Sequence, residues 1–432
     1  MPLPLDRRRL MLAGGGVLAL GAAGTLALRP GDHGGVHSPY FLGLRAALKA
    51  AGLARPTLVI DQRRLQANID AVNGFLPARQ GLRVVVKSLP SLGLLDAVAR
   101  GAGTTRFMVF NGPMLATMVA ARPDGDYLMG KPLAAAEARA FYAAGPGKAA
   151  GFDPARRLQW LIDTPARLDQ YAAIARAAGT TMRVSLEIDV GLHRGGFSNP
   201  ADFAAALTRI AADPALSLGG LMGYDPHLGH VKAGHGRDKG LARSRGLYQG
   251  FLDQVRTAQG AAFNPAALTL NTAGSPTYRL HRDSPYANDI SVGSAFVKPL
   301  DFDVDTLAAH VPAAFIATPV LKALPRTDLP TGEALTPLFR LWDRNTEQAF
   351  FIHGGHWLAA PVSPPGLQTS ALFGRSSNQE LLTGSGRVSL KPDDMVFLRP
   401  TQSEAVLLQF GDLAVWDGKA ISAMWPVFPT SA

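Results

Sequence analysis

The chain has 432 residues, of which 47% are hydrophobic and 18% charged, with a formal net charge of +10 and no cysteine. This length exceeds one ordinary domain and suits a barrel of about 250 residues with a second domain. The composition excludes bulk disorder, and the lack of cysteine excludes disulfides, zinc–thiolate sites and thiol nucleophiles. The basic residues are scattered, without a stripe interleaved with aromatic residues, so we expect small anions rather than nucleic acid as partners.

The first residues predict an export signal. Arg7, Arg8 and Arg9 precede an uncharged run rich in Gly, Ala and Leu over residues 10–28. A basic start before an apolar stretch is typical of exported proteins, and paired arginines indicate the twin-arginine route to the periplasm. We therefore expect a signal over residues 1–30. The alternative is an uncleaved membrane anchor, although five glycines make the run a poor permanent span.

Residues 31–54 are expected to form a linker and a helix, after which short apolar runs alternate with Ala-rich segments. The segments 164–178 and 200–212 have the apolar spacing of helices. The apolar runs expected as strands cover residues 84–86, 107–110, 127–129, 160–162, 184–188, 221–224, 268–270 and 295–297. This alternation predicts an α/β protein in which residues 55–300 form a (β/α)8 barrel.

Beyond residue 300 the sequence changes character and becomes rich in Pro, Thr and Gly. Short β-type runs cover residues 350–352, 394–398, 405–409 and 413–416. Short strands separated by turn residues are typical of a β domain, which we predict over residues 301–432.

A lysine, Lys87, ends the first predicted barrel strand directly after three valines. Three consecutive β-branched residues suit a strand buried on both faces. An ammonium group at the end of such a strand has to pair with a carboxylate, reach solvent, or lose its charge by forming an imine with an aldehyde cofactor. The run by itself leaves all three open.

Other chemistry-bearing residues lie at further strand ends, where active sites of such barrels are found. Arg194 lies shortly after the fifth predicted strand, and Tyr224 ends the sixth. The turn over residues 271–277 follows the seventh strand and combines a glycine for close backbone approach with hydroxyl donors; these residues are Thr272, Gly274, Ser275 and Thr277. Phosphate sites of this fold commonly lie there, although taken alone the segment is an ordinary turn.

The lysine strand, the segment over residues 187–196 and the turn over residues 271–277 together resemble the fold-type III pyridoxal-phosphate enzymes. Over residues 55–425 the chain is most similar to the D-threonine aldolase and D-serine dehydratase branch, with alanine racemase more distant. The resemblance implies pyridoxal 5′-phosphate as cofactor, a small amino acid as substrate and a homodimer. It implies that Lys87 forms the imine with the cofactor and transfers protons, and that Tyr224 lies beside the cofactor ring.

The resemblance also implies which residues hold the rest of the cofactor. The phosphate would be bound by Gly274, Ser275, Thr277, Gly293 and Ser294. Arg194 would brace the site from the end of the fifth strand; the alternative is a structural arginine that pairs with Asp189.

The chain departs from the lyase branch at its metal ligands. Where the branch has H-x-C or H-x-D, this chain has Gln402 and Glu404, and Asn378 replaces a further histidine. A carboxamide oxygen is a weak ligand, so we expect no zinc site. The weak candidates for a divalent metal are Gln402 with Glu404, and the H-x-x-H pair His353 and His356.

The chain also departs from the racemase branch. The eighth-strand arginine that faces the pyridine nitrogen there is matched here by Ser291, and no tyrosine follows Tyr286 to act as a second base. These differences favour a lyase, an aldolase or dehydratase acting on a small D-configured β-hydroxy amino acid. An amino-acid racemase or epimerase, or a cofactor-binding protein with reduced catalysis, are the alternatives.

Overall fold

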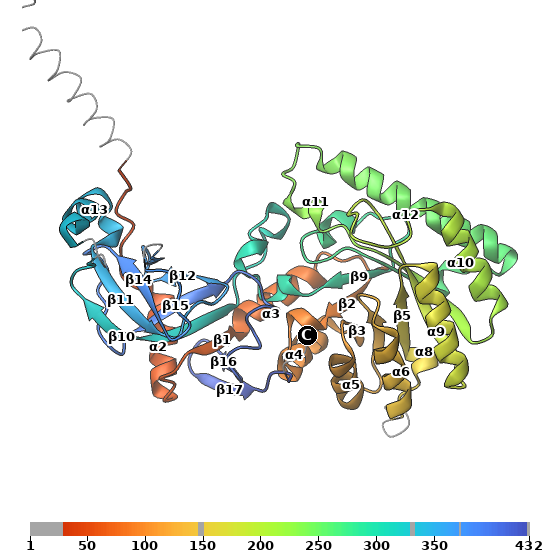
Figure 1. Cartoon of the computed structure of the whole chain (residues 1–432), viewed down its shortest axis with the longest axis horizontal. Helices are drawn as coiled ribbons and strands as arrows, with labels where there is room; N and C mark the ends of the chain where they lie inside the picture. The colour runs from red at the N-terminus through yellow and green to blue at the C-terminus, as the bar shows by residue number, and fades with distance from the viewer. Residues whose placement is uncertain (1–28, 146–150, 329–332, 371–372, 430–432) are drawn as a thin grey trace, which may run out of the picture. The chain divides into compact units, whose positions relative to one another are not determined.

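In the computed structural model, residues 29–145, 151–328, 333–370 and 373–429 are described. The chain divides into two compact units (Figure 1): one comprises Thr57–Ile316 with Arg399–Ala432, the other Met1–Pro56 with Ala317–Leu398. Within the described ranges, no helix combines the length and apolar character needed to cross a bilayer. The expected export signal lies outside the described residues.

The larger unit is built on a closed barrel of eight parallel strands. In chain order these are β2 (Gly81–Val85), β3 (Arg106–Val109), β4 (Asp126–Met129), β5 (Leu158–Ile162), β6 (Met182–Ile188), β7 (Leu216–Gly223), β8 (Thr269–Thr272) and β9 (Asp289–Val292). The ring closes where β2 pairs with β9, with Arg83 opposite Ser291. The predicted barrel followed by a β domain is confirmed.

Helices surround the barrel on its outside (Figure 1). They are α3 (Gln62–Asn73), α4 (Leu92–Ala102), α5 (Gly112–Ala121), α6 (Ala135–Ala144), α8 (Pro154–Arg157), α9 (Pro165–Ala177), α10 (Pro200–Ala212), α11 (His227–His230) and α12 (Arg237–Gln259). Both Ala-rich segments are helices as predicted, because each begins with a capping side chain followed by proline. Thr164 caps α9 and Asn199 caps α10 by accepting backbone N–H groups.

Two apolar runs that were expected as strands are not strands. The eighth barrel strand is β9, and residues 295–297 come after it, with Ser294–Phe296 forming a 3-10 turn (η5). A search for apolar runs misses β9 because Asp289 and Ser291 interrupt it, yet all four of its residues are buried. Residues 405–409 form turns, and the run is apolar because Val406 and Leu407 are fully buried.

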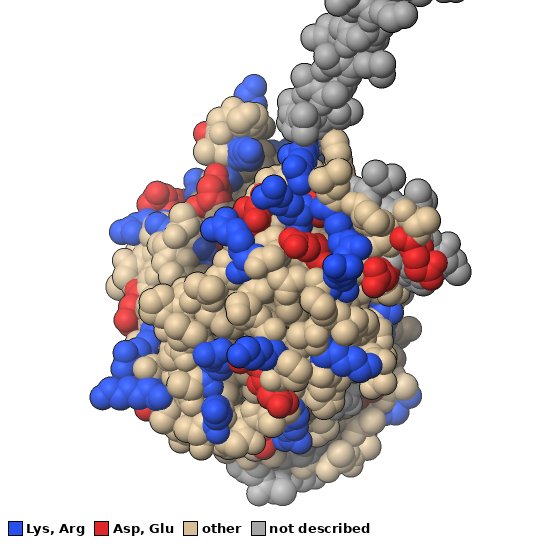
Figure 2. All heavy atoms as spheres, turned by 90° about the vertical axis from the view of Figure 1, so that its left-hand side faces the viewer, with Lys and Arg blue, Asp and Glu red and all other residues tan. Residues whose placement is uncertain are grey.

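The smaller unit is a β domain with one N-terminal helix. Its elements are α2 (Pro39–Ala50), α13 (Thr336–Trp342), β11 (Gln348–His353), β12 (Ala359–Ser363), β13 (Gln368–Thr369) and β14 (Gln379–Gly384), together with β10 (Ala314–Leu324) from Ala317 onward and β15 (Met395–Pro400) as far as Leu398. β11 lies between β10 and β14 and pairs antiparallel with both. On the face seen in Figure 2, Lys and Arg side chains are dispersed among uncharged residues rather than gathered in one stripe.

The last part of the chain belongs to the larger unit, although we expected it in the β domain. There β16 (Leu413–Trp416) pairs parallel with β1 (Thr57–Asp61) and antiparallel with β17 (Ile421–Trp425). Gly93 of α4 lies so close to the Trp425 ring that an added Cβ would come within 2.4 Å of it. The C-terminal hairpin is therefore packed on the barrel unit.

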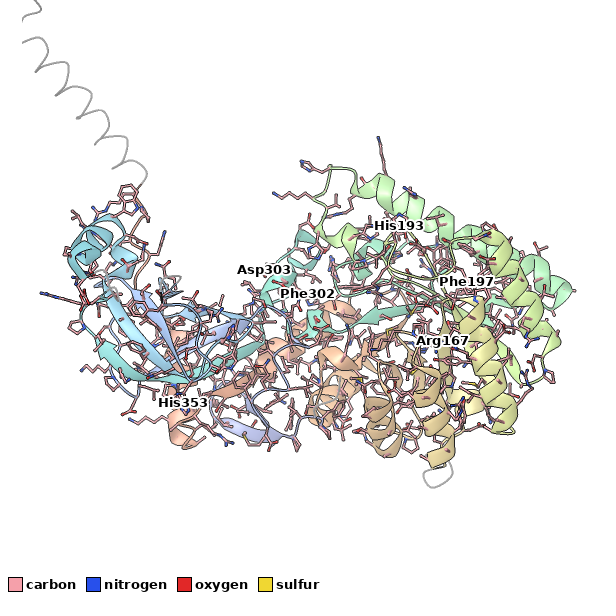
Figure 3. The ribbon with its side chains drawn as sticks, in the orientation of Figure 1. Arg167, His193, Phe197, Phe302, Asp303 and His353 are labelled. Atoms are coloured by element: carbon pink, nitrogen blue, oxygen red, sulfur yellow. The ribbon has the colours of Figure 1, made fainter. Side chains whose placement is uncertain are left out.

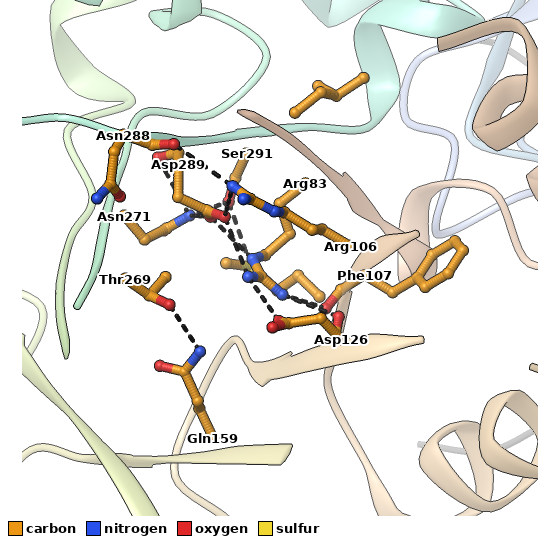
Figure 4. Close-up of polar contacts among 12 residues, drawn as sticks. Arg83, Arg106, Phe107, Asp126, Gln159, Thr269, Asn271, Asn288, Asp289 and Ser291 are labelled. Atoms are coloured by element: carbon orange, nitrogen blue, oxygen red, sulfur yellow. Dashed lines mark hydrogen bonds and ion pairs between the residues drawn. The ribbon is translucent and has the colours of Figure 1, made fainter. Parts of the chain in front are cut away.

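A buried polar network crosses the barrel interior (Figure 4). Arg83 of β2 is 1% exposed and donates to both carboxylate oxygens of Asp289 on β9, at 2.8 and 3.0 Å. It also donates to the backbone carbonyl of Asp126 on β4, at 3.0 Å. Asn271 of β8 donates to Asp289 and, at 2.9 Å, to the hydroxyl of Ser291. Since buried charges require full pairing, the network fixes the register of these strands.

Asp289→Ala should destabilise the protein strongly, because it leaves the Arg83 guanidinium buried without its main partner. Breaking such a pair costs about 3–5 kcal/mol. The matched control is Asp169→Ala, which removes an exposed ion pair with Arg209 and should cost less than about 1 kcal/mol. Urea unfolding measures both variants; a small loss in both would contradict this account of the network.

Candidate active site

A pocket opens at the C-terminal ends of the barrel strands and contains about 610 Å³ of space, part of it open to solvent. It brings together most of the predicted site residues: Lys87, Arg194, Tyr224, Gly274, Ser275, Gly293 and Ser294 all line it. Glu404 and Ser291 line it as well, whereas the predicted residues Thr272, Thr277 and Gln402 are not among the lining residues.

Lys87 lies in the 3-10 turn Val86–Ser88 (η1) that directly follows β2, so the strand ends before the lysine rather than at it. Its side chain is 40% exposed, and its Nζ is 3.3 Å from Oε1 of Glu404. The Nζ also lies 4.7 Å from the centre of the Phe110 ring. Of the three alternatives for this ammonium group, the structure shows the first: Lys87 pairs with a carboxylate, and the pair lies in a pocket.

Tyr224 follows β7, and its ring lies against the turn after β8. A Cβ added to Gly274 would come within 2.5 Å of Cε2 of this ring, so glycine is required by the close approach of the tyrosine. The guanidinium carbon of Arg194 lies 5.0 Å from the ring centre, within reach of a cation–π interaction. Burial raises the pKa of Tyr224 and Arg194 acts against that rise, so the phenol is protonated at neutral pH.

Asp189 pairs with His193 and not with Arg194. Its Oδ2 is 2.7 Å from Nδ1 of His193, and its Oδ1 accepts the backbone N–H groups of Gly191 and His193. Burial raises the pKa of Asp189, but these hydrogen bonds outweigh it and leave the pKa below its usual value. The structural pairing considered for Arg194 is therefore wrong, and its side chain lies over Tyr224 instead.

Ser275 joins the two glycine-containing turns on one side of the pocket. Its Oγ accepts the backbone N–H groups of Gly293 and Ala295, both at 3.0 Å, which leaves its own hydroxyl hydrogen available to a ligand. Gly293 packs against β2, since an added Cβ would lie 2.7 Å from Cβ of Val85. Thr277 has a different task, because its hydroxyl donates to the buried Asp225 at 3.0 Å.

Asp225 is a residue of the site region that sequence reasoning missed. It is fully buried directly after Tyr224 and accepts hydrogen bonds from His281 at 2.8 Å and Ser244 at 3.2 Å, in addition to Thr277. Burial raises the pKa of Asp225, but the opposing effect of His281 and the hydroxyl donors is larger, so the pKa lies below its usual value. This carboxylate anchors the turn after β8 to the loop after β7. The only signal in the sequence is its position beside Tyr224.

Glu404 was considered only as a metal ligand, whereas in the structure it is the partner of Lys87. Gln402 is exposed. His353 and His356 belong to the smaller unit and are also exposed. No group of three or more histidines and carboxylates positioned to hold a metal ion occurs in the part of the chain that the structure describes. Metal use stays a prediction.

Comparison with known proteins gives a family match that covers more than half of the chain. A family model described as alanine racemase, N-terminal domain, matches residues 60–298. An alanine racemase of Mycobacterium ulcerans (strain Agy99) is 33% identical over 131 residues, which are 30% of this chain and 32% of that protein. The match thus spans about a third of the length of that relative.

Two solved structures share the fold over most of their length. D-threonine aldolase from Filomicrobium marinum aligns with a TM-score of 0.67 and 17% identity, covering 88% of this chain and 95% of that one. D-threo-3-hydroxyaspartate dehydratase from Delftia sp. HT23 aligns with a TM-score of 0.65 and 19% identity, covering 86% and 97% respectively. At these identities the likeness establishes the fold alone.

Glu187→Gln should make stability less dependent on pH. Burial raises the pKa of Glu187 from 4.5 to about 7, with Arg194 opposing the rise. The stability this carboxyl contributes is therefore present below its unfolded pKa and is lost as pH rises through about 7. The neutral variant should gain up to about 3 kcal/mol over the wild type near pH 8 and little near pH 4. Thermal unfolding of cofactor-free protein across pH measures this; parallel curves would contradict it.

Proposed function

This chain belongs to the alanine racemase N-terminal domain family of fold-type III pyridoxal-phosphate enzymes, and we propose that it is a lyase acting on a small D-configured β-hydroxy amino acid. The reaction would be aldol cleavage or dehydration. The observation that carries the proposal is the position of the Lys87 amine, in a partly enclosed pocket with an aromatic hydroxyl, an arginine and a carboxylate.

The chemistry of the pocket fits pyridoxal phosphate. The described lining residues include two cationic groups, Lys87 and Arg194, but only one carboxylate. Such an excess of positive charge suits a phosphate anion. Ser275 has a hydroxyl hydrogen that its two accepted hydrogen bonds leave available to a phosphate oxygen. When bound, the cofactor supplies an electron-withdrawing ring that stabilises negative charge at the α-carbon of the substrate.

The roles of the individual residues follow from their positions. Lys87 would bind the cofactor covalently and move protons at the α-carbon. Ser275, Gly274, Gly293 and Ser294 would hold its phosphate, and Tyr224, kept protonated and braced by Arg194, would lie beside its ring. Thr272 and Thr277 would support the phosphate turn from behind.

Cleavage is favoured over racemisation because the sequence lacks the second base that racemisation requires. Two-base racemisation requires a second proton-transfer group on the opposite side of the α-carbon, and no tyrosine follows Tyr286 in the sequence to be supplied by a partner subunit. The one carboxylate among the described lining residues, Glu404, instead lies beside Lys87. We also infer a homodimer, in keeping with the family.

Lys87 should be the site of cofactor attachment. Protein purified with pyridoxal phosphate should be yellow, and borohydride should bleach it while fixing the cofactor to Lys87, as read by peptide mapping. Lys87→Ala should lose the attachment and at least about 100-fold of the activity. The control is Lys131→Ala, outside the pocket lining, which should behave as wild type. A label on Lys131, Lys232 or Lys298 would refute the assignment.

Activity should survive EDTA and respond little to added Zn²⁺. Gln402 and Asn378 are weak neutral groups in the positions of metal-binding histidines, and a single carboxylate with such partners cannot compete with a chelator. Assays before and after dialysis against EDTA test this. Loss of activity restored by Mn²⁺ or Mg²⁺ would point to a hard-ion site at Glu404, and strong zinc dependence to His353 and His356.

Export should depend on the arginines at the start of the chain. We propose a periplasmic protein that folds and acquires its cofactor before export by the twin-arginine route. Replacing Arg7, Arg8 and Arg9 by Lys should retain the folded, yellow protein in the cytoplasm, as cell fractionation would reveal. Continued export of the triple variant would instead indicate a different signal or a plain anchor.

A further inference from the structure

Glu404 reaches the pocket from a segment that is clamped to the loop after β9. Arg399 donates to both carboxylate oxygens of Asp303, at 2.7 and 2.8 Å, and to the backbone carbonyls of Lys298 and Pro299. Asp303 follows Phe302, which lines the pocket, and Figure 3 labels both on this loop. The position of Glu404 at the barrel mouth is therefore fixed by the fold.

Three serine hydroxyls then orient the Glu404 carboxylate. Ser403 donates to Oε2 at 3.1 Å, and Ser88 lies 3.5 Å from Oε1. Ser294 donates to Ser88 at 3.1 Å, and its hydroxyl oxygen also lies 3.0 Å from that of Ser403, so the three serines and the carboxylate form one polar cluster. All three serines are buried, whereas the Glu404 side chain is 33% exposed and its Oε1 lies 3.3 Å from Nζ of Lys87. These contacts keep the Glu404 carboxylate directed towards Lys87.

Of the described residues that line the pocket, four have titratable side chains: Lys87, Arg194, Tyr224 and Glu404. Arginine side chains do not serve as proton acceptors in proteins. Burial keeps the proton on Tyr224. Among the described lining residues, Glu404 is thus the only proton acceptor besides Lys87, and the two groups are in contact.

We propose that Glu404 is a second catalytic residue, which accepts the hydroxyl proton of a bound β-hydroxy amino acid. The inference rests on the proposed function, because it requires the cofactor on Lys87 and a hydroxy amino acid as substrate. It narrows that function to aldol cleavage. Dehydration needs a proton given to the leaving hydroxyl group, whereas a carboxylate takes one away.

The proton balance uses both residues. The hydroxyl O–H bond breaks as its proton passes to Glu404, and the O–H electron pair forms the carbonyl bond of an aldehyde. The Cα–Cβ bond breaks, its electron pair stays on the α-carbon, and the ammonium group of Lys87 protonates that carbon to give the shorter amino acid. Transfer of the proton from Glu404 to Lys87, across the contact of 3.3 Å, restores both groups.

The test compares wild-type holoenzyme with Glu404→Gln, Glu404→Asp and the control Lys131→Ala, which changes an exposed residue outside the pocket lining. Aldehyde release from D-threonine and D-serine reports cleavage, and α-hydrogen exchange of D-alanine in D₂O reports the chemistry of Lys87 alone. Glu404→Gln should lose at least about 100-fold in cleavage but less than about 3-fold in exchange. Glu404→Asp should keep part of the cleavage, and Lys131→Ala all of it.

A second readout does not depend on turnover. The carboxylate beside Lys87 Nζ favours the protonated form of the group attached there, so the pH midpoint of the visible cofactor band should fall by about one unit in Glu404→Gln. An unchanged midpoint would show that the carboxylate does not face the attached nitrogen, which would overturn the proposal.

Other outcomes also decide the matter. Equal losses on D-alanine and the hydroxy amino acids, unchanged cleavage in Glu404→Gln, or release of ammonia and a keto acid instead of an aldehyde would each overturn the role of Glu404. So would a wild type that exchanges D-alanine but cleaves neither hydroxy amino acid. A wild type that gains no visible band with pyridoxal phosphate would refute the proposed function, and the inference with it.

Discussion

The ion pair between Arg83 and Asp289 links the first and last strands of the barrel, and the geometry of the pocket depends on it. Both side chains are 1% exposed, and the pair fixes the register of β2 against β9. That register carries Lys87, just past the end of β2, to the turn of Gly293 and Ser294 that follows β9. A buried pair is weak evidence for net stability, but removing one partner is costly. The pair therefore enforces one arrangement of the strands rather than a generally tighter barrel.

From this register the pocket acquires two layers with different chemistry. The inner layer pairs its own charges, because the Arg83 guanidinium contacts the carboxylates of both Asp289 and Asp126, and Asn271 donates to Asp289. At the mouth, Lys87 and Glu404 contact each other, and both side chains are partly exposed. A group at the mouth can exchange protons with a substrate because it is partly exposed, whereas the inner charges cannot leave their partners.

The sequence predicted the barrel and most of the pocket because their signals are local. Lys87, Tyr224 and Ser275 each lie just past an apolar run, where the fold brings chemistry-bearing residues together. The eighth strand was misplaced because Asp289 and Ser291 interrupt its apolar run, and the Arg83 that pairs with Asp289 lies far away in the sequence. The role of Glu404 was missed because its contacts, such as that with Ser88, join residues 316 apart in the chain. Neither hydrophobic periodicity nor a local motif predicts a contact between residues so far apart in the sequence.

If pyridoxal-phosphate chemistry takes place in the Lys87 pocket, the cofactor has to be attached there. A crystal structure of the protein grown with pyridoxal phosphate tests it most directly. We expect continuous density from Lys87 Nζ to the cofactor, a phosphate within hydrogen-bond distance of Ser275 Oγ, and a Glu404 carboxylate still within about 4 Å of the attached nitrogen. Cofactor bound through another lysine, or a phosphate held away from the turns after β8 and β9, would contradict it.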